Sequence, residues 1–397
     1  MTDVSQTTCG FFCVDDSRRL ARRRVPRLVF DFVDGAAGQE CAAQLNYEAF
    51  STVKLQPRVL RRVDKRSIAK TFLGFDFGMP FGISPMGMCN LSWPRADPMF
   101  AKVASDRQIP LCVSSAASTL LEDMFVMSGN LAWFRLYVGE SYEAAFAMVE
   151  RAKNVGYEVL LLTVDVPQVA KRLRDQHNGF RVPFKLGPKQ FLDFALHPRW
   201  SIETLMNGVP TAVNYETAND GRGFVRNESR ALVDMNFLRQ LRELWRGKLV
   251  VKGVLHEEDA RLVKAAGVDA IYVSNHGGRQ LDSAPPAIQI LPKIREAVGS
   301  NFPLVFDSGI RSGEDVIKAL ALGADFVMLG RPFMYAVAAD GARGLQTLVD
   351  ILGEEIDVAL AQIGFRNIED VDASAVLWRT TVRTVGQPLT KDRVSFW

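Results

Sequence analysis

The stretch DAIYVSN (269–275) is a continuous run of apolar residues that ends abruptly in polar ones and leads into HGGRQLD (276–282). A strand that is covered on both faces has this continuous pattern, whereas a strand with one solvated face alternates between apolar and polar residues. Similar runs, bounded by glycine, proline or polar residues, recur at MPFGISP (79–85), IPLCVSS (109–115), AWFRLYV (132–138), EVLLLTVD (158–165), KLVVKGV (248–254), PLVFDSG (303–309) and DFVMLGR (325–331).

Helical patterns separate most of these runs. The segment 141–156 has Ala145, Met148, Val149 and Ala152 at helical spacing, and Gly156 is a typical stop signal. The segments 256–267 and 312–323 repeat this pattern, with acidic residues in the first turn, where the helix dipole favours them. Eight strand–helix units predict a (β/α)8 TIM barrel. A doubly wound sheet is the alternative, but no GxGxxG motif follows the first run.

The length and composition fit one barrel domain. A chain of 397 residues with 48% hydrophobic and 23% charged residues is an ordinary globular protein. We expect a single domain over 1–397, with a helical capping segment at 1–78, the barrel at 79–368 and an insertion at 180–247 between the fourth and fifth strands. The segment 166–247 is far longer than the next crossover, 255–268, and long irregular insertions are usually functional or mobile.

Charge and cysteine content exclude several classes of protein. A net charge of +3 is too small to indicate nucleic-acid binding. The five cysteines include no CxxC pair and predict a reducing, cytoplasmic environment; we expect no metal site, since nothing near Cys9 and Cys13 completes a zinc set. No run is long enough to span a bilayer. The basic run at 18–27 is interpreted as a solvated helix face that begins at Asp16 or Ser17, with membrane or polyanion binding as the alternative.

Polar residues gather at the carboxyl ends of the predicted strands, where barrel enzymes have their active sites. Lys252 lies inside an apolar run, and a buried lysine is costly unless it has a negative or electron-rich partner. The last two strands lead into DSGIRSG (307–313) and LGRP (329–332), glycine–arginine turns before helix starts that predict a phosphate site. The polar residues at the strand ends are Ser84, Ser114, Ser115, Arg135, Tyr137, Thr163, Asp165, Lys252, Ser274, Asn275, His276, Asp307 and Arg331.

The motifs SNHGGRQLD, TVDVP, LVVKGV, DSGIRSG and LGRP together resemble the FMN-dependent 2-hydroxy acid dehydrogenase and oxidase family, which includes glycolate oxidase, lactate oxidase and mandelate dehydrogenase. The resemblance runs from about Val25 to Ile368. HPRW (197–200), NGVP (207–210) and LWRGKLVVKG (244–253) most resemble the bacterial mandelate dehydrogenase branch. The resemblance implies bound FMN, a small 2-hydroxy acid substrate, a homotetramer, and an electron acceptor that is a quinone, a carrier protein or oxygen.

The resemblance also implies roles for individual residues. His276 would be the base that takes a proton from the substrate, and Asp165 would stabilise the imidazolium, a pairing that suits acid–base chemistry near neutral pH. Arg172 and Arg279 would bind the substrate carboxylate, Tyr137 would hydrogen-bond the reacting oxygen, and the glycines after His276 would let substrate and flavin approach. The residues implied to hold FMN are Pro85, Met86, Gly87, Ser114, Arg135, Thr163, Lys252, Ser274, Asp307, Gly309, Arg311, Gly330 and Arg331. The alternative role for Asp307 is to cap the next helix only.

Two positions depart from the family's pattern, and a third differs from glycolate oxidase. Phe32, in LVFDFVDG, stands where the family has a tyrosine that holds the substrate carboxylate. Arg135 replaces the usual glutamine before LY, and Ala116 stands where glycolate oxidase has a tryptophan. These changes predict a bulky, aryl substrate such as mandelate. The alternative is a hydroxy diacid, whose second acidic group would pair with Arg135. A glycolate- or lactate-type oxidase, a flavin-binding barrel with altered chemistry, and an NAD-linked or sugar-phosphate barrel enzyme are the competing functions.

The region 180–215 is rich in large apolar residues interspersed with basic ones, from Phe180 and Phe184 to Trp200. This mixture is typical of segments that lie in a bilayer interface. We therefore expect 180–215 to contact a membrane, which would place the enzyme peripherally on the inner face of the cytoplasmic membrane. The alternative is an apolar flap that packs on its own barrel or on a neighbouring subunit.

Overall fold

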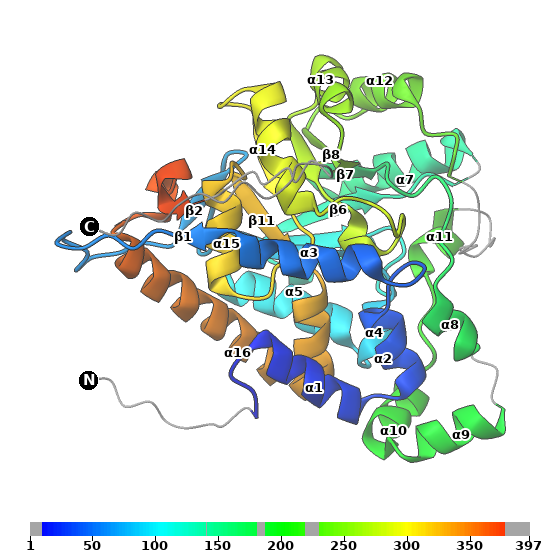
Figure 1. The fold of residues 1–397 in the computed structure, drawn as a ribbon. Helices are drawn as coiled ribbons and strands as arrows, with labels where there is room; N and C mark the ends of the chain where they lie inside the picture. The colour runs from blue at the N-terminus through cyan, green and yellow to red at the C-terminus, as the bar shows by residue number, and fades with distance from the viewer. Residues whose placement is uncertain (1–9, 140, 181–186, 219–229, 378–397) are drawn as a thin grey trace, which may run out of the picture.

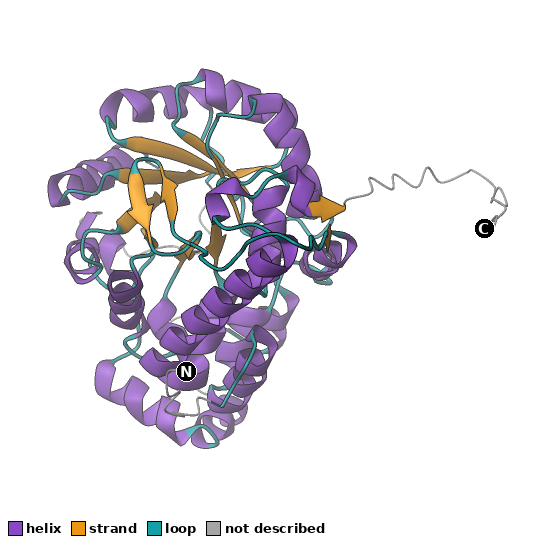
Figure 2. Cartoon of the chain, turned by 90° about the vertical axis from the view of Figure 1, so that its left-hand side faces the viewer, coloured by secondary structure: helices purple, strands orange, loops and turns teal. Residues whose placement is uncertain are grey.

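Eight parallel strands form a closed barrel in the computed structural model, which describes residues 10–139, 141–180, 187–218 and 230–377. Each predicted apolar run forms one strand, so the predicted TIM barrel is confirmed. Figures 1 and 2 show the strands at the centre with helices around them. The strands are β4 (Phe81–Met86), β5 (Leu111–Ser114), β6 (Ala132–Leu136), β7 (Val159–Thr163), β8 (Lys248–Val254), β9 (Ala270–Val273), β10 (Leu304–Phe306) and β11 (Phe326–Leu329).

One or more helices connect each strand of the barrel to the next strand along the chain. The predicted stop at Gly156 and the acidic first turns at 257–259 and 314–315 are present. Helix α16 bends at Asp340 and Gly341, where the backbone leaves helical geometry. The helices are α5 (Ala96–Arg107), α6 (Leu121–Met127), α7 (Tyr142–Val155), α12 (Met235–Leu244), α13 (Glu257–Ala265), α14 (Ala287–Val298), α15 (Gly313–Ala321) and α16 (Arg331–Ile363), with the short α4 (Cys89–Ser92) after β4.

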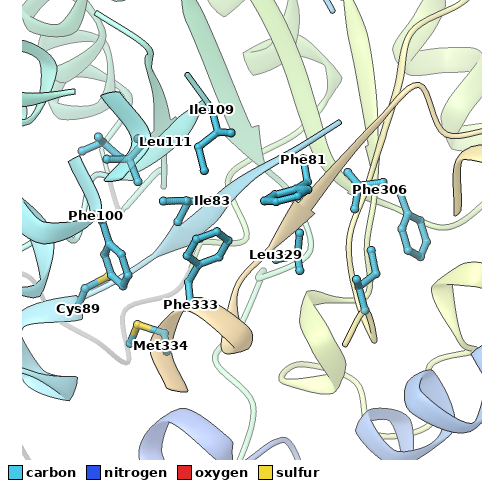
Figure 3. Packing of buried hydrophobic residues seen from close by; sticks show 14 of the residues in the cluster. Phe81, Ile83, Cys89, Phe100, Ile109, Leu111, Phe306, Leu329, Phe333 and Met334 are labelled. Carbon is cyan, nitrogen blue, oxygen red and sulfur yellow. The ribbon is translucent and has the colours of Figure 1, made fainter. Parts of the chain in front are cut away.

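Two apolar layers build the core. Side chains on the outer faces of the strands pack against the helices; Phe100 of α5 and Phe333 of α16 meet edge to face over β4, with centroids 6.5 Å apart (Figure 3). Inside the barrel, a second layer includes Trp133, Leu161 and Phe326. The hairpin of β2 (Lys70–Phe72) and β3 (Phe75–Phe77) closes the amino-terminal end of the barrel with Phe72 and Phe77.

The inward-facing positions change character along the strands. On β6, Trp133 belongs to the apolar layer, and Arg135 and Tyr137, two and four residues later, line a cavity. On β8, Val250 is followed in the same way by Lys252. Because side chains two residues apart share one face of a strand, the sequence alternation alone places these polar groups at the carboxyl end of the barrel.

Part of the amino-terminal segment lies at the carboxyl end of the barrel, where backbone oxygens of residues 32–35 accept from Arg279 and Arg331. The segment comprises α1 (Val14–Arg24), α2 (Arg27–Asp34), α3 (Cys41–Thr52) and β1 (Lys54–Leu55), which pairs with β12 (Val376–Leu377). Helix α1 begins at Val14 with Cys13 as N-cap, so the predicted start at Asp16 or Ser17 is wrong by a few residues; those positions lie within it, and Asp15 and Asp16 occupy its first turn. The exposed Arg19, Arg22 and Arg23 agree with a solvated face.

The crossover between β7 and β8 contains helices rather than irregular chain. They are α8 (Leu173–His177), α9 (Pro188–Ala195), α10 (Pro198–Asn207) and α11 (Val213–Ala218), followed by α12 directly before β8. Proline starts α9 and α10, as is favoured at the first helical position. In Figure 1, α9 and α10 lie at the lower edge of the molecule, beyond α2. Phe184 of the predicted membrane segment lies outside the described residues.

Candidate active site

His276 and Asp165 are in contact at the carboxyl end of the barrel. The His276 Nδ1 lies 2.9 Å from Asp165 Oδ1, and its Nε2 lies 3.4 Å from the Tyr137 hydroxyl. His276 lies three residues after the end of β9, and it has a left-handed backbone with φ of 58°, which is uncommon for a residue with a side chain. A conformation of this kind persists where the surroundings impose it, often at functional sites.

Burial lowers the pKa of His276 below its ordinary value, and the negative charge and hydrogen bond of Asp165 oppose this change. The imidazole is therefore neutral at pH 7 and able to accept a proton. Because Asp165 engages Nδ1, the nitrogen left to exchange a proton is Nε2, on the side of Tyr137. The three residues that the resemblance implied for catalysis thus lie together in the structure.

The glycines after His276 allow close packing within the protein. A Cβ at Gly277 would lie 2.8 Å from Arg331 Nη1, and a Cβ at Gly278 would lie 2.5 Å from the Ala43 backbone nitrogen of α3. Both glycines also have positive φ. They therefore allow the His276 turn to pack against Arg331 and against the amino-terminal segment.

Lys252 has its negative partner inside the barrel. Its Nζ donates to Asp307 Oδ2 at 3.0 Å and to the Ser274 hydroxyl at 2.6 Å. Burial would raise the pKa of Asp307, but the charge of Lys252 and the hydrogen bonds of Ser274 and Ser308 outweigh it and lower that pKa. Asp307 does not cap the following helix, because the N-cap of α15 is Ser312.

The carboxyl end of α2 contacts Arg279, one of the two arginines expected to bind the substrate carboxylate. Arg279 donates to the backbone oxygens of Phe32 and Val33, at 2.9 and 3.2 Å, and its guanidinium lies 5.5 Å from the centre of the Phe32 ring. Arg172 lines the same cavity, and its backbone bridges to Gly38. The structure therefore places Phe32 beside Arg279, where the sequence comparison positioned it.

Two further arginines form the end of the cavity at β10 and β11. Arg311 and Arg331 both line it. Arg311 donates to the carbonyl oxygen of Ile310, and Arg331 donates to those of Val33, Gly35 and Gly277. Burial lowers the pKa of Arg331, and the nearby positive charge of Arg311 adds to this effect. Two like charges, both half-buried, beside the amino terminus of α16 favour a bound anion.

Further groups in the cavity and directly behind its wall fit a flavin nucleotide. Among the described residues, no hydrogen-bond partner is present for the buried Thr163 Oγ1 or for Nε and Nη1 of Arg135. Buried polar groups normally have partners, so unsatisfied ones indicate a ligand. The predicted residues that line the cavity are Phe32, Pro85, Met86, Gly87, Ala116, Arg135, Tyr137, Arg172, Lys252, His276, Arg279, Asp307, Gly309, Arg311, Gly330 and Arg331.

Four predicted residues lie behind this lining. Asp165 holds His276, and Ser274 accepts from both Lys252 and the His276 backbone. Ser114 accepts from the backbone nitrogen of Ala116 at 3.0 Å, and Thr163 occupies the end of β7. These four residues are therefore placed to support the cavity wall from behind.

The sequence analysis missed three residues of the site. Arg230, 5% exposed, lines the cavity with its guanidinium 4.8 Å from the centre of the Tyr137 ring. Tyr215 of α11 donates to the Tyr137 backbone oxygen at 3.3 Å and shares a hydrogen bond with Ser115. Phe180 was noted only as part of the apolar insertion, yet it stacks on Phe32 with ring centroids 4.5 Å apart. All three come from the long crossover, whose path no local pattern reveals.

Metal-ligating side chains do not cluster within the described ranges: no group of three or more His, Cys, Asp or Glu residues there is arranged to hold a metal ion. Cys9 lies outside those ranges. In the same part of the chain, no helix is both long and apolar enough to cross a bilayer.

Comparisons with known proteins agree with this geometry. The sequence profile of FMN-dependent dehydrogenases matches residues 21–379. The chain is 38% identical over 364 residues to (S)-mandelate dehydrogenase of Pseudomonas putida, covering 90% of this chain and 92% of that protein. It is 36% identical over 370 residues to L-lactate dehydrogenase of Pseudomonas syringae pv. syringae, covering 91% and 97% respectively.

A solved structure described as the monotopic membrane protein (S)-mandelate dehydrogenase superimposes with a TM-score of 0.88 at 36% identity, covering 93% of this chain and 100% of that one. The family match covers most of the chain, and the cavity holds the arginines and unsatisfied donors that a flavin nucleotide needs. The protein belongs to the FMN-dependent 2-hydroxy acid dehydrogenase family, whose members are oxidoreductases that use FMN.

Proposed function

We propose that the protein oxidises an (S)-2-hydroxy acid with a bulky, aryl side chain, such as mandelate, to the 2-oxo acid. The observation that carries the reaction is the contact of His276 with Asp165 at 2.9 Å, in a cavity that also contains Tyr137 and two arginines. The oxidation releases two electrons and two protons from the carbon and its hydroxyl. FMN, when bound, supplies the chemistry that accepts the electron pair.

The side chains divide the remaining work among them. His276 takes a proton from the substrate at Nε2, and Asp165 stabilises the positive charge that results. Arg172 and Arg279 bind the substrate carboxylate, since a planar guanidinium can hold both oxygens. The Tyr137 hydroxyl, 3.4 Å from His276 Nε2, is positioned to hydrogen-bond the oxygen that becomes a ketone.

The binding of FMN would involve the whole inner wall of the cavity. Lys252 would lie by the ring, where negative charge grows on reduction, and Arg311 and Arg331 would bind the phosphate. The remaining residues that we propose to hold FMN are Pro85, Met86, Gly87, Ser114, Arg135, Thr163, Ser274, Asp307, Gly309 and Gly330.

The preference for an aryl acid rests on the apolar side of the cavity. Phe32 has no hydroxyl with which to hold a carboxylate, and its ring stacks on Phe180 with an interplanar angle of 4°. Ala116 leaves room where glycolate oxidase has a tryptophan, and Val166 and Val169 also line the cavity. An aromatic side chain would gain affinity by burying its surface against these groups.

A lactate-type substrate is the second candidate, because one similar protein is an L-lactate dehydrogenase. The experiment that separates the two compares flavin reduction by glycolate, lactate, mandelate and 2-hydroxyglutarate in the wild type, Phe32→Tyr and Ala116→Trp. We expect mandelate to be the best substrate of the wild type and to lose most in Ala116→Trp. A hydrogen bond to a charged group contributes about 1.5–3 kcal/mol, so Phe32→Tyr should improve binding of small acids roughly ten- to a hundredfold. Faster reduction of the wild type by lactate or glycolate would exclude the aryl preference.

The exposed apolar face of α9 and α10 supports membrane association. Leu205 and Met206 are 83% and 79% exposed, and α9 has no buried residue. On the opposite face, Trp200 is 1% exposed and donates to the Leu91 backbone oxygen, which anchors α10 to the barrel. We propose that this face lies in a bilayer interface and that the enzyme, acting as a homotetramer on the inner face of the cytoplasmic membrane, passes electrons to a quinone there.

A further inference from the structure

Arg135 occupies an unusual electrostatic position. It stands near the end of β6 where the family usually has a neutral glutamine, it is 3% exposed, and it lines the cavity. Its guanidinium lies 3.5 Å from the centre of the Tyr137 ring. Within the described part of the chain, its Nε and Nη1 have no hydrogen-bond partner. Burying a charge without a partner is costly, so the missing partner is expected to be a ligand.

Four other cationic side chains that line the cavity differ from Arg135 in this respect. Lys252 is compensated by Asp307 at 3.0 Å. Arg311 and Arg331 lie at the end of the cavity that suits a phosphate, and Arg279 is held at the carboxyl end of α2 by backbone oxygens. The charge of Arg135 is thus not needed to bind the phosphate. Arg135 lies close to the catalytic Tyr137 and His276, and its positive charge also acts to lower the pKa of His276.

We propose that Arg135 raises the reduction potential of bound FMN. Reduction adds two electrons and one proton to the neutral ring, which leaves one negative charge on it. A fixed positive charge inside the barrel stabilises that anion more than the neutral oxidised ring, and the low dielectric of the interior strengthens the effect. A glutamine at this position offers a dipole but no charge. The 2-hydroxy acid then gives up its electron pair more favourably, and the acceptor must have a correspondingly higher potential.

The test is an anaerobic potential measurement on the FMN-loaded protein with reference dyes and no hydroxy acid. In Arg135→Gln, we expect the equilibrium constant for two-electron reduction to fall at least tenfold, which corresponds to about 30 mV. Arg135→Lys should stay within about threefold of the wild type because it keeps the charge. Arg242→Gln, which removes a charge at the amino-terminal end of the barrel, is the matched control and should not change the potential.

An unchanged potential in Arg135→Gln with FMN bound would overturn the proposal. If that variant loses FMN, Arg135→Met provides a second neutral side chain with a long stem, and it must shift the potential in the same direction. Loss of FMN from both neutral variants, with retention in Arg135→Lys, would show that the charge acts in cofactor retention and not on the redox equilibrium. Because no hydroxy acid is present, each result is independent of the substrate assignment.

Discussion

At the scale of single residues, the proposed reaction depends most directly on His276, which acts as the base. Replacing it with alanine removes the base but leaves the cavity wall of arginines, Lys252 and Asp307 in place. We expect His276→Ala to retain FMN and to reduce the flavin about 10²–10⁴-fold more slowly, the usual effect of losing a general base. Rapid-mixing measurements of flavin reduction provide the rate, and the visible flavin spectrum controls for loss of cofactor. Near-normal reduction in this variant would show that His276 is not the base.

The pH dependence follows from the burial of the same residue. Burial lowers the pKa of His276 from its ordinary value of 6.5, so the neutral, competent form persists below pH 6.5 and is lost as the pH falls through the lowered pKa. We expect kcat/KM, which reports the free enzyme, to have an acidic limb with its midpoint below 6.5.

Asp165 raises the pKa of His276, so Asp165→Asn should move this limb to still lower pH while also slowing turnover. A wild-type limb centred above pH 7, or a limb that moves upward in Asp165→Asn, would contradict this explanation of the pKa.

Arg331 and Arg311 are expected to determine how tightly the protein retains FMN. Each guanidinium is expected to form charge-assisted hydrogen bonds with the FMN phosphate, each contributing about 1.5–3 kcal/mol. Arg331→Ala and Arg311→Ala should therefore raise the dissociation constant of FMN roughly ten- to a hundredfold, measured by the fluorescence of released flavin. Arg242→Ala, whose native guanidinium pairs with Asp269 at the opposite end of the barrel, serves as the control. Equal retention by all four proteins would place the phosphate elsewhere.

At the scale of elements, α9 and α10 form a surface with separate anchoring and exposed faces. We expect Leu205→Glu combined with Met206→Glu to reduce flotation with liposomes at least tenfold, because membrane binding scales with the apolar area that is buried. Val59→Glu with Leu60→Glu, which changes two side chains that are 80% and 104% exposed outside these helices, is the matched control. If both double variants float like the wild type, α9 and α10 do not bind the membrane.

The strands were predictable from sequence and the long crossover was not. A continuous apolar run such as 269–275 predicts a buried strand by itself, because apolar residues at successive positions indicate that both faces of the strand are covered. Residues between β7 and β8 contact distant parts of the chain: Phe180 stacks on Phe32, and Trp200 donates to the Leu91 backbone oxygen. Contacts of this kind depend on the assembled fold, so the segment could be recognised only as long and apolar.

At the scale of the whole molecule, the barrel topology explains why the residues of the site could be predicted from the sequence. The carboxyl ends of eight strands meet at one end, so residues more than a hundred positions apart, such as Asp165 and His276, were placed together before the structure was known. Arg230 was missed because an arginine beside a loop is ordinarily exposed, and only the closed fold buries it against Tyr137. The close packing of Gly277 against Arg331 and of Gly278 against α3 likewise depends on the assembled fold.

The most direct test of the central claim is an anaerobic titration of the purified, FMN-loaded protein with (S)-mandelate, followed by the flavin absorption. The account predicts that the yellow colour bleaches with stoichiometric formation of the 2-oxo acid, and that (R)-mandelate at the same concentration bleaches it far more slowly or not at all. A protein that binds FMN but keeps its colour with (S)-mandelate, lactate and glycolate alike would contradict the proposal that this cavity oxidises 2-hydroxy acids.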